Sequence, residues 1–168
     1  MIIKPDNEML SYSGRIDFDD RLAPVLVYAC SSIGMKFTGT SLKAVIANHR
    51  SCWTNELGYF IDGEQKRFTL SSDEEKKTYT LAEGLSEGTH ELLLFKRMDS
   101  CHTFTFYGFE IDDGAEVLPL PEKPKRKMEF FGDSVSCGEV SEAVAYVGKP
   151  DPEHDGEYSN SWYSYAWM

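Results

Sequence analysis

The sequence lacks two features that common binding functions need: a long apolar run and an excess of positive charge. No uninterrupted apolar stretch approaches the roughly 20 residues that a membrane-spanning helix requires. Its 17 lysines and arginines face 28 aspartates and glutamates, so the formal net charge is −11. An acidic surface repels phosphate backbones and anionic lipid. We therefore expect neither nucleic acid nor a membrane as a partner.

Cysteine is also scarce. Cys30, Cys52, Cys101 and Cys137 share no CxxC spacing, so they give only a weak signal for zinc binding or redox chemistry. We expect free thiols, as in a reducing compartment. The N-terminal residues lack the apolar core of a signal peptide, which predicts a cytoplasmic protein. A secreted protein already trimmed of its leader would read the same way.

The composition is that of a globular protein. Of the 168 residues, 41% are hydrophobic and 13% aromatic, which is too apolar for a disordered chain. This length suffices for one domain with a core, or for one domain and part of another.

Short apolar segments separated by turn signals dominate the first two thirds of the chain. In residues 42–47, Leu42, Ala44 and Ile46 alternate with Lys43 and Val45, as in a strand with one buried face. A two-residue Asp-Gly turn at 62–63 predicts a β-hairpin. We expect strands at residues 16–18, 25–28, 34–38, 42–47, 58–61, 66–70, 78–81, 90–96 and 103–112. This spacing predicts a mainly β fold, an antiparallel jelly-roll β-sandwich over residues 1–117.

The composition changes after this sandwich. Residues 118–127 contain three prolines and four basic residues, which favours an extended, solvated linker. In residues 128–168 we expect a short apolar strand at 128–131 and a polar loop at 137–158. An N-cap within 159–161 then predicts a helix over 162–168. One face of that helix, with Trp162 and Tyr165, is expected to pack on a sheet.

A candidate nucleophile follows the predicted strand at 128–131. A serine attacks an ester when a base removes its proton and hydrogen-bond donors stabilise the oxyanion. Gly132 permits a tight turn, Asp133 can brace the loop, and Ser134 supplies a hydroxyl and a backbone N–H that can act as an oxyanion donor. The Gly-Asp-Ser triplet alone is a weak signal, because aspartate and serine are common in turns. The apolar segment before it strengthens the signal.

Residues 131–138, Phe-Gly-Asp-Ser-Val-Ser-Cys-Gly, resemble the first signature block of the SGNH (GDSL-type) hydrolases. The upstream part resembles one branch of these enzymes, the carbohydrate esterase family 2 acetyl-esterases, in which a small jelly roll precedes the catalytic domain. The matching stretches are residues 12–18, 37–42, 60–63, 88–97, 108–112 and 160–166. The resemblance covers nearly the whole chain and implies that residues 128–168 begin an α/β SGNH domain.

This resemblance implies an esterase that removes acetyl groups from plant polysaccharides or their oligosaccharides, of the xylan or mannan type, without a cofactor. Ser134 would be the nucleophile. The other oxyanion donors would be a glycine and an asparagine from later blocks, and the base a histidine far beyond the serine. The sequence contains no Gly-x-Asn-Asp block and no such late histidine. We therefore expect a fragment that lacks its C-terminal catalytic segment and is inactive alone.

Two Asp-x-x-His matches, at 99–102 and 151–154, are read as coincidences of composition. His154 lies in the loop after the nucleophile block and could contact substrate, although a surface histidine is the simpler interpretation. The acidic residues around it are expected to form a solvated loop and not a metal site. Trp53 could stack on a sugar or be a partly buried loop residue. Arg97 could lie at the domain junction near substrate or form a salt bridge within the sandwich.

An alternative function is a carbohydrate-binding module without catalysis. Jelly rolls often bind sugars through aromatic side chains, and candidates here are Trp53, Tyr59, Tyr79 and Phe106. A third possibility is a structural platform that shapes the esterase pocket. In either case one strand and one helix cannot cover a parallel sheet. Residues 128–168 should therefore expose apolar side chains unless another segment or chain covers them.

Overall fold

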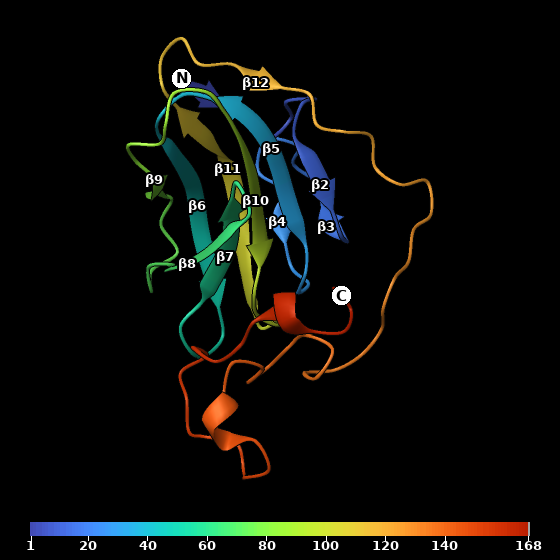
Figure 1. The fold of residues 1–168 in the computed structure, drawn as a ribbon. Coiled ribbons are helices and arrows are strands. Elements are labelled where there is room, and N and C mark those ends of the chain that lie inside the picture. The colour runs from blue at the N-terminus through green and yellow to red at the C-terminus, as the bar shows by residue number, and fades with distance from the viewer. Residues whose placement is uncertain (168) are drawn as a thin grey trace.

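The computed structural model describes residues 1–167 and shows two antiparallel β-sheets packed face to face (Figure 1). The first sheet has the order β3 (Ile16–Asp17), β4 (Val25–Leu26), β11 (His102–Ile111), β6 (Leu42–Arg50) and β9 (Lys77–Ala82), with β1 (Ile2–Ile3) pairing with β11. The second has the order β12 (Val117–Leu118), β5 (Ser32–Thr38), β10 (Thr89–Lys96), β7 (Glu56–Ile61) and β8 (Glu64–Thr69), with β2 (Ser11–Ser13) pairing with β5. The predicted mainly β sandwich is confirmed.

Alternating side chains build the core between the two sheets. On β6, Leu42, Ala44 and Ile46 are fully buried while the intervening Lys43 and Val45 are only half-buried, as the sequence predicts. The core also contains fully buried aromatic residues from other strands, namely Phe37, Phe104, Phe106 and Phe109. Phe106 and the nearly buried Tyr59 cannot stack on a sugar, so their proposed binding role is wrong.

The predicted hairpin at residues 62–63 is also confirmed. Asp62 and Gly63 have φ angles of 53° and 84° and join β7 to β8 through a two-residue turn, with Ile61 opposite Glu64. Positive φ at both central positions is the geometry that matches strand twist in a tight hairpin. The two-residue strands β1 and β12 were not predicted, because a pair of residues is too short to show alternation.

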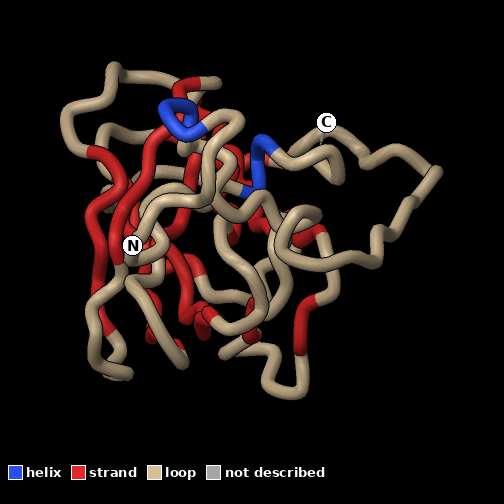
Figure 2. Tube along the Cα trace, turned by 90° about the horizontal axis from the view of Figure 1, so that it is seen from below, coloured by secondary structure: helices blue, strands red, loops and turns tan. Residues whose placement is uncertain are grey.

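The linker and the C-terminal residues leave the sandwich and return to it. After β12, residues 119–130 run along one side of the sandwich, and residues 131–167 lie against the end where β10 finishes (Figure 1). Figure 2, which is seen from below, shows the short helices and tan loops at this end. In residues 1–167 the helices are 3₁₀ turns, η1 (Val144–Tyr146) and η2 (Ser161–Tyr163).

The predicted strand at 128–131 is wrong for this structure. These four residues are all described, and they form no strand. A strand needs a neighbour for its backbone hydrogen bonds. Here the segment is instead held by side chains: Glu129 pairs with Arg15 at 2.7 Å, and the Arg15 guanidinium lies 5.9 Å from the centre of the Phe131 ring.

The helix predicted over 162–168 is largely wrong, and its last residue lies outside the described residues. The N-cap is correct, because the Asn160 side chain accepts a hydrogen bond from the Trp162 amide, but η2 lasts only three residues. The indoles of Trp162 and Trp167 both lie within 6 Å of the Phe95 ring centre, at 5.8 and 5.9 Å. In an α-helix, side chains five residues apart point about 140° away from each other. Trp162 and Trp167 could therefore not both pack on the Phe95 ring if this segment were a regular α-helix.

The predicted apolar exposure after the linker is confirmed. Met128, Phe131, Val135, Val144 and Val147 are between 70% and 81% exposed. The four cysteines are free thiols, as their spacing predicts. Within residues 1–167, no helix is long and apolar enough to cross a membrane.

Candidate active site

Ser134 lies on the surface at the start of a compact turn. Its carbonyl accepts hydrogen bonds from the backbone N–H groups of Cys137 and Glu139, at 3.1 and 3.0 Å. Within residues 1–167, neither its hydroxyl nor its backbone N–H has a hydrogen-bond partner. The side chain is exposed and is not packed into the interior. The hydroxyl and the candidate oxyanion donor are therefore both free to meet a substrate.

Gly132 and Asp133 shape the approach to Ser134. A Cβ on Gly132 would lie 1.8 Å from Ser136 Oγ and 2.6 Å from Ser136 Cβ, so a side chain there would displace its neighbour. The Asp133 carboxylate accepts a hydrogen bond from the Val135 amide at 3.1 Å. This is the bracing contact expected of Asp133, and it leaves the Ser134 amide uncovered.

Ser136 and Cys137 also carry potential nucleophiles, but the first is hydrogen-bonded and the second is partly buried. The Ser136 hydroxyl is 2.5 Å from the Tyr165 hydroxyl. Cys137 is half-buried, and this burial raises the pKa of its thiol, which disfavours the reactive thiolate. Among these three neighbouring side chains, Ser134 is the one that the structure leaves available.

The turn that begins at Ser134 is attached to residues 158–160. The Asn160 amide donates to the Gly138 carbonyl at 2.9 Å, and the Glu142 amide donates to the Tyr158 carbonyl at 2.9 Å. Gly138 has φ of 72°, and a Cβ there would lie 2.4 Å from the Asn160 carbonyl oxygen. This close contact between two backbones requires glycine at position 138.

Arg97 connects the turn at residues 134–142, which holds the candidate nucleophile, to the sandwich; we call it the nucleophile turn. It directly follows β10, and its side chain is only 2% exposed. Its guanidinium Nη2 lies 2.9 Å from Glu142 Oε2, and its Nε lies 3.8 Å from Glu56 Oε2. The more exposed Arg67 contacts the carboxylate of Glu56 at 3.2 Å and that of Glu142 at 3.5 Å. Arg97 therefore lies at the junction and also pairs with Glu56 within the sandwich, so both alternatives hold in part. A role of the buried Arg97 in substrate binding stays a prediction.

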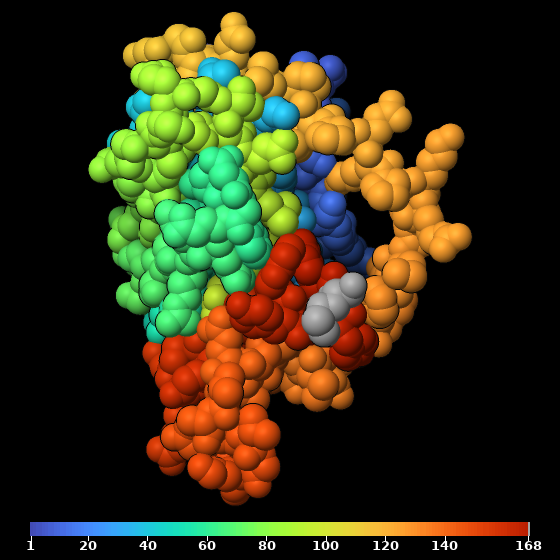
Figure 3. Space-filling model, in the orientation of Figure 1, coloured from blue at the N-terminus to red at the C-terminus, as the bar shows by residue number. Residues whose placement is uncertain are grey.

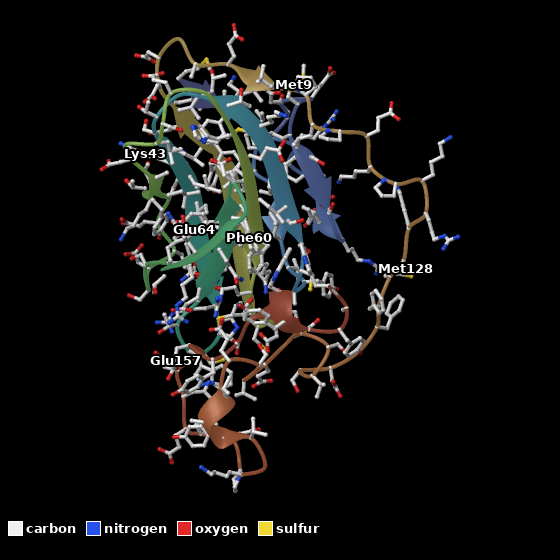
Figure 4. The ribbon with its side chains drawn as sticks, in the orientation of Figure 1. Met9, Lys43, Phe60, Glu64, Met128 and Glu157 are labelled. Carbon is white, nitrogen blue, oxygen red and sulfur yellow. The ribbon has the colours of Figure 1, made fainter. Side chains whose placement is uncertain are left out.

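Trp53 and His154 pack together. The Trp53 ring lies 4.5 Å from the His154 ring and is stacked on the His102 ring at 6.2 Å, so it is a partly buried loop residue. The Gly156 amide donates to His154 Nδ1 at 3.0 Å, and the Thr54 amide donates to the Asp155 carbonyl at 3.0 Å. These contacts hold the acidic loop against the sandwich (Figure 4, near Glu157). A role of Trp53 or His154 in substrate binding stays a prediction.

The histidines of the chain do not activate Ser134 in this structure. Within residues 1–167 no hydrogen bond joins Ser134 to a histidine. His102 is fully buried, with Nδ1 2.9 Å from Asp99 Oδ1 and Nε2 3.1 Å from the Cys52 carbonyl oxygen. Both ring nitrogens therefore contact oxygens within the sandwich, and His102 makes no hydrogen bond to Ser134. The His102–Asp99 pair stabilises the start of β11.

The expectation that the acidic loop is solvated and holds no metal stays a prediction. Among the residues that the structure describes, no group of three or more histidine, cysteine, aspartate and glutamate side chains is arranged to hold a metal ion. Asp151 and Glu153 are exposed, and Asp155 accepts a hydrogen bond from the Thr54 hydroxyl.

The sandwich and the start of the linker match a known family. Residues 12–121 match the carbohydrate esterase 2 N-terminal family. The chain belongs to this family. The match contains ten of the twelve strands found in residues 1–167 in full, together with most of β2, and it includes the junction residue Arg97.

Relatives of this carbohydrate esterase 2 chain are esterases. The chain is 32% identical over 162 residues to the cellulase/esterase CelE of Acetivibrio thermocellus, covering 96% of this chain and 19% of that protein. It is 26% identical over 122 residues to an acetylxylan esterase/glucomannan deacetylase of Cellvibrio japonicus, covering 68% of this chain and 34% of that protein. The chain thus spans 19% and 34% of the lengths of these two relatives.

A solved structure of a family two carbohydrate esterase from Clostridium thermocellum, in complex with cellohexaose, has the same fold. It superposes with a TM-score of 0.82 at 29% identity and covers 94% of this chain and 46% of that one. At this coverage the similarity extends beyond the sandwich into residues 128–167.

Three residues of the junction were not predicted as site residues. Glu142 and Arg67 carry no sequence signal, because a single charged residue in a loop or strand is common. Asn160 was recognised only within the N-cap segment. Its role in holding Gly138 depends on backbone geometry that a sequence does not show.

Proposed function

We propose that this chain supplies the sandwich and the nucleophile turn of an SGNH-type serine esterase that removes acetyl groups from plant polysaccharides or their oligosaccharides. The observation that carries the proposal is Ser134: an exposed hydroxyl and a free backbone N–H on a braced turn, in a chain of the carbohydrate esterase 2 family. The hydroxyl would attack the acetyl carbonyl, and the Ser134 amide would stabilise the oxyanion.

The chain by itself is expected to be almost inactive. A serine hydroxyl is a weak nucleophile without a base, and no histidine is bonded to Ser134 within residues 1–167. By resemblance to the family, the base is a late histidine, helped by a glycine and an asparagine donor, and residues 1–168 do not contain these blocks. The substrate class, xylan or mannan type, follows from the same resemblance and is supported by the similarity to the acetylxylan esterase/glucomannan deacetylase.

Hydrolysis of 4-nitrophenyl acetate tests this proposal. The 168-residue chain should show little turnover above the buffer rate. The natural polypeptide that contains these residues should be active, and Ser134→Ala should abolish that activity. Ser72→Ala is the matched control, because Ser72 is an exposed serine in a turn of the sandwich. Rapid turnover by the 168-residue chain, or full activity of Ser134→Ala, would contradict the proposal.

A groove on the second sheet favours carbohydrate binding as a second candidate function. It has a volume of about 360 Å³ and lies between the linker and strands β2, β5, β10 and β7. Its wall combines apolar side chains with polar groups, contributed by Phe60, Leu93, Ser11, Ser13, Glu91 and Lys123. Phe60 is only half-buried on β7 (Figure 4). Calorimetry of the chain with xylo- and manno-oligosaccharides tests this role, and the absence of heat with all of them would remove it.

A further inference from the structure

Arg97 is a charged side chain in an unusual position. It is the largest fully buried side chain of the described residues. Removing a guanidinium from water is costly unless carboxylates compensate its charge. Glu142 supplies the closer carboxylate, at 2.9 Å, and Glu56 the second, at 3.8 Å. Since Arg67 balances the second negative charge, the four side chains together are neutral.

The carboxylate that meets Arg97 belongs to the same turn as the nucleophile. Glu142 lies eight residues after Ser134. Its second oxygen accepts a hydrogen bond from Asn160 Nδ2 at 2.7 Å. One carboxylate therefore connects the sandwich, the nucleophile turn and residue 160.

Further hydrogen bonds connect Arg97 to Ser134 through residues 160 and 161. Asn160 holds Gly138 through its amide, and its carbonyl accepts a hydrogen bond from the Ser141 hydroxyl at 3.0 Å. The next residue, Ser161, donates its amide to the Arg97 carbonyl at 2.9 Å. Gly138 is in turn one residue from Glu139, whose amide bonds to the Ser134 carbonyl. Figure 3 shows the orange and red segment pressed against the end of the sandwich where these bonds lie.

We propose that Arg97 is a positioning residue for Ser134, acting through Glu142 and Asn160. This inference rests on the proposed function, because it concerns how the sandwich fixes the nucleophile. The buried charge favours one position of the turn on the sandwich, since any other position removes Glu142, the closer of the two carboxylates that compensate the guanidinium. Ser134 is thereby oriented before substrate arrives. The sandwich contributes to catalysis through this contact and does not touch substrate there.

A positioning role predicts a loss of kcat at unchanged KM. A displacement of about 1 Å at a reacting group can cost roughly 10²-fold in rate. In the natural polypeptide containing these residues, we expect Arg97→Met and Glu142→Gln each to lower kcat for 4-nitrophenyl acetate by about 10²-fold. Arg97→Lys keeps the charge but loses the forked geometry, so its kcat should lie between the wild type and Arg97→Met.

The double variant separates a shared mechanism from general damage. If both residues act through one contact, Arg97→Met with Glu142→Gln should lower kcat no further than either change alone. The matched control is Glu64→Gln, which removes a 3.3 Å ion pair with Lys66 on the exposed hairpin strand β8 and should leave kcat unchanged.

A second measurement uses the 168-residue chain and needs no activity. The half-buried Cys137 lies in the nucleophile turn, and the exposed Cys52 and Cys101 serve as internal references. Mass spectrometry after brief iodoacetamide treatment should show faster alkylation of Cys137 in Glu142→Gln than in wild type, at equal rates for Cys52 and Cys101. Glu64→Gln should match wild type.

The two proposals fail in different ways. Retained activity in Ser134→Ala would overturn the proposed function. Loss of activity in Ser134→Ala, together with a wild-type kcat in Arg97→Met and Glu142→Gln, would overturn the positioning role alone. Strictly additive losses in the double variant, or unchanged Cys137 alkylation in Glu142→Gln, would also overturn it.

Discussion

Replacing Lys96 with methionine should change how stability depends on pH. Lys96 ends β10, is fully buried, and donates hydrogen bonds from Nζ to the carbonyl oxygens of Met98, at 2.6 Å, and Asp99. Burial disfavours the ammonium and lowers the pKa of Lys96 to about 7, although the charge of Asp99 acts in the opposite direction. In the unfolded chain a lysine has a pKa near 10.4.

The sign and size of the effect follow from these two values. Between pH 7 and 8.5 the folded protein releases the Lys96 proton while the unfolded chain keeps it. The unfolded state therefore binds more protons, and the free energy of unfolding rises with pH. Integration over this interval gives an increase of about 1.5 kcal/mol. Above this interval the half-buried thiols of Cys30 and Cys137, whose pKa values burial raises, contribute a fall in stability.

Urea denaturation followed by tryptophan fluorescence measures this slope. The wild-type chain and Lys96→Met are compared at several pH values from 7 to 8.5, and the difference between their slopes isolates Lys96. The control is Lys43→Met, because Lys43 lies on β6 with its side chain directed away from the core (Figure 4). Equal slopes for wild type and Lys96→Met would refute the argument that burial removes this proton.

Three further changes test the packing and the charges of the sandwich. Gly58→Ala places a Cβ 2.1 Å from the buried Phe95 ring, so overpacking should lower the free energy of unfolding by about 1–3 kcal/mol, measured in urea. A hydrogen bond to Asp62 raises the pKa of His90. Burial alone would raise the pKa of Asp62, but its hydrogen bonds to His90 and to a backbone amide outweigh burial and lower this pKa. The His90 contribution is present below its unfolded pKa and is lost as pH rises through the folded value. The Asp62 contribution is present above its unfolded pKa and is lost as pH falls through the folded value. Asp62→Asn should therefore make the melting temperature depend less on pH, both below roughly pH 4 and above roughly pH 6.5. A dependence on pH equal to that of the wild type would contradict this. Trp162→Ala removes an indole that packs on Phe95 and should cost about 2 kcal/mol, detected as faster hydrogen exchange of the C-terminal amides; unchanged exchange would contradict it.

The sandwich could be predicted because its signals are local. The alternation of Leu42, Ala44 and Ile46 fixes which face of β6 is buried, and the Asp62–Gly63 turn fixes the register of its hairpin. Each of these signals lies within a few residues of the structure that it predicts. Strand spacing then favours two packed sheets.

The C-terminal residues could be predicted only in part, because their structure depends on distant contacts. Residues 128–131 have the composition of a strand, but a strand also needs a neighbour with free backbone groups. The candidate serine can be proposed from its motif, whereas its connection to the sandwich depends on Arg97 and Glu142, which are 45 residues apart. A contact of this kind leaves no pattern in a single sequence.

The order of the strands has a consequence for synthesis. Ile2–Ile3 pairs with residues 109–110 of β11, and residues 117–118 pair with β5, so the first sheet cannot be completed until the chain has been translated beyond residue 110. Since domains fold as units while the ribosome extends the polypeptide, the sandwich can close before residues 158–161 emerge from the ribosome. The carbonyl groups of residues 96 and 97 are then already in place when Ser161 emerges. The turn at residues 134–142 thus packs onto a sandwich that has already folded.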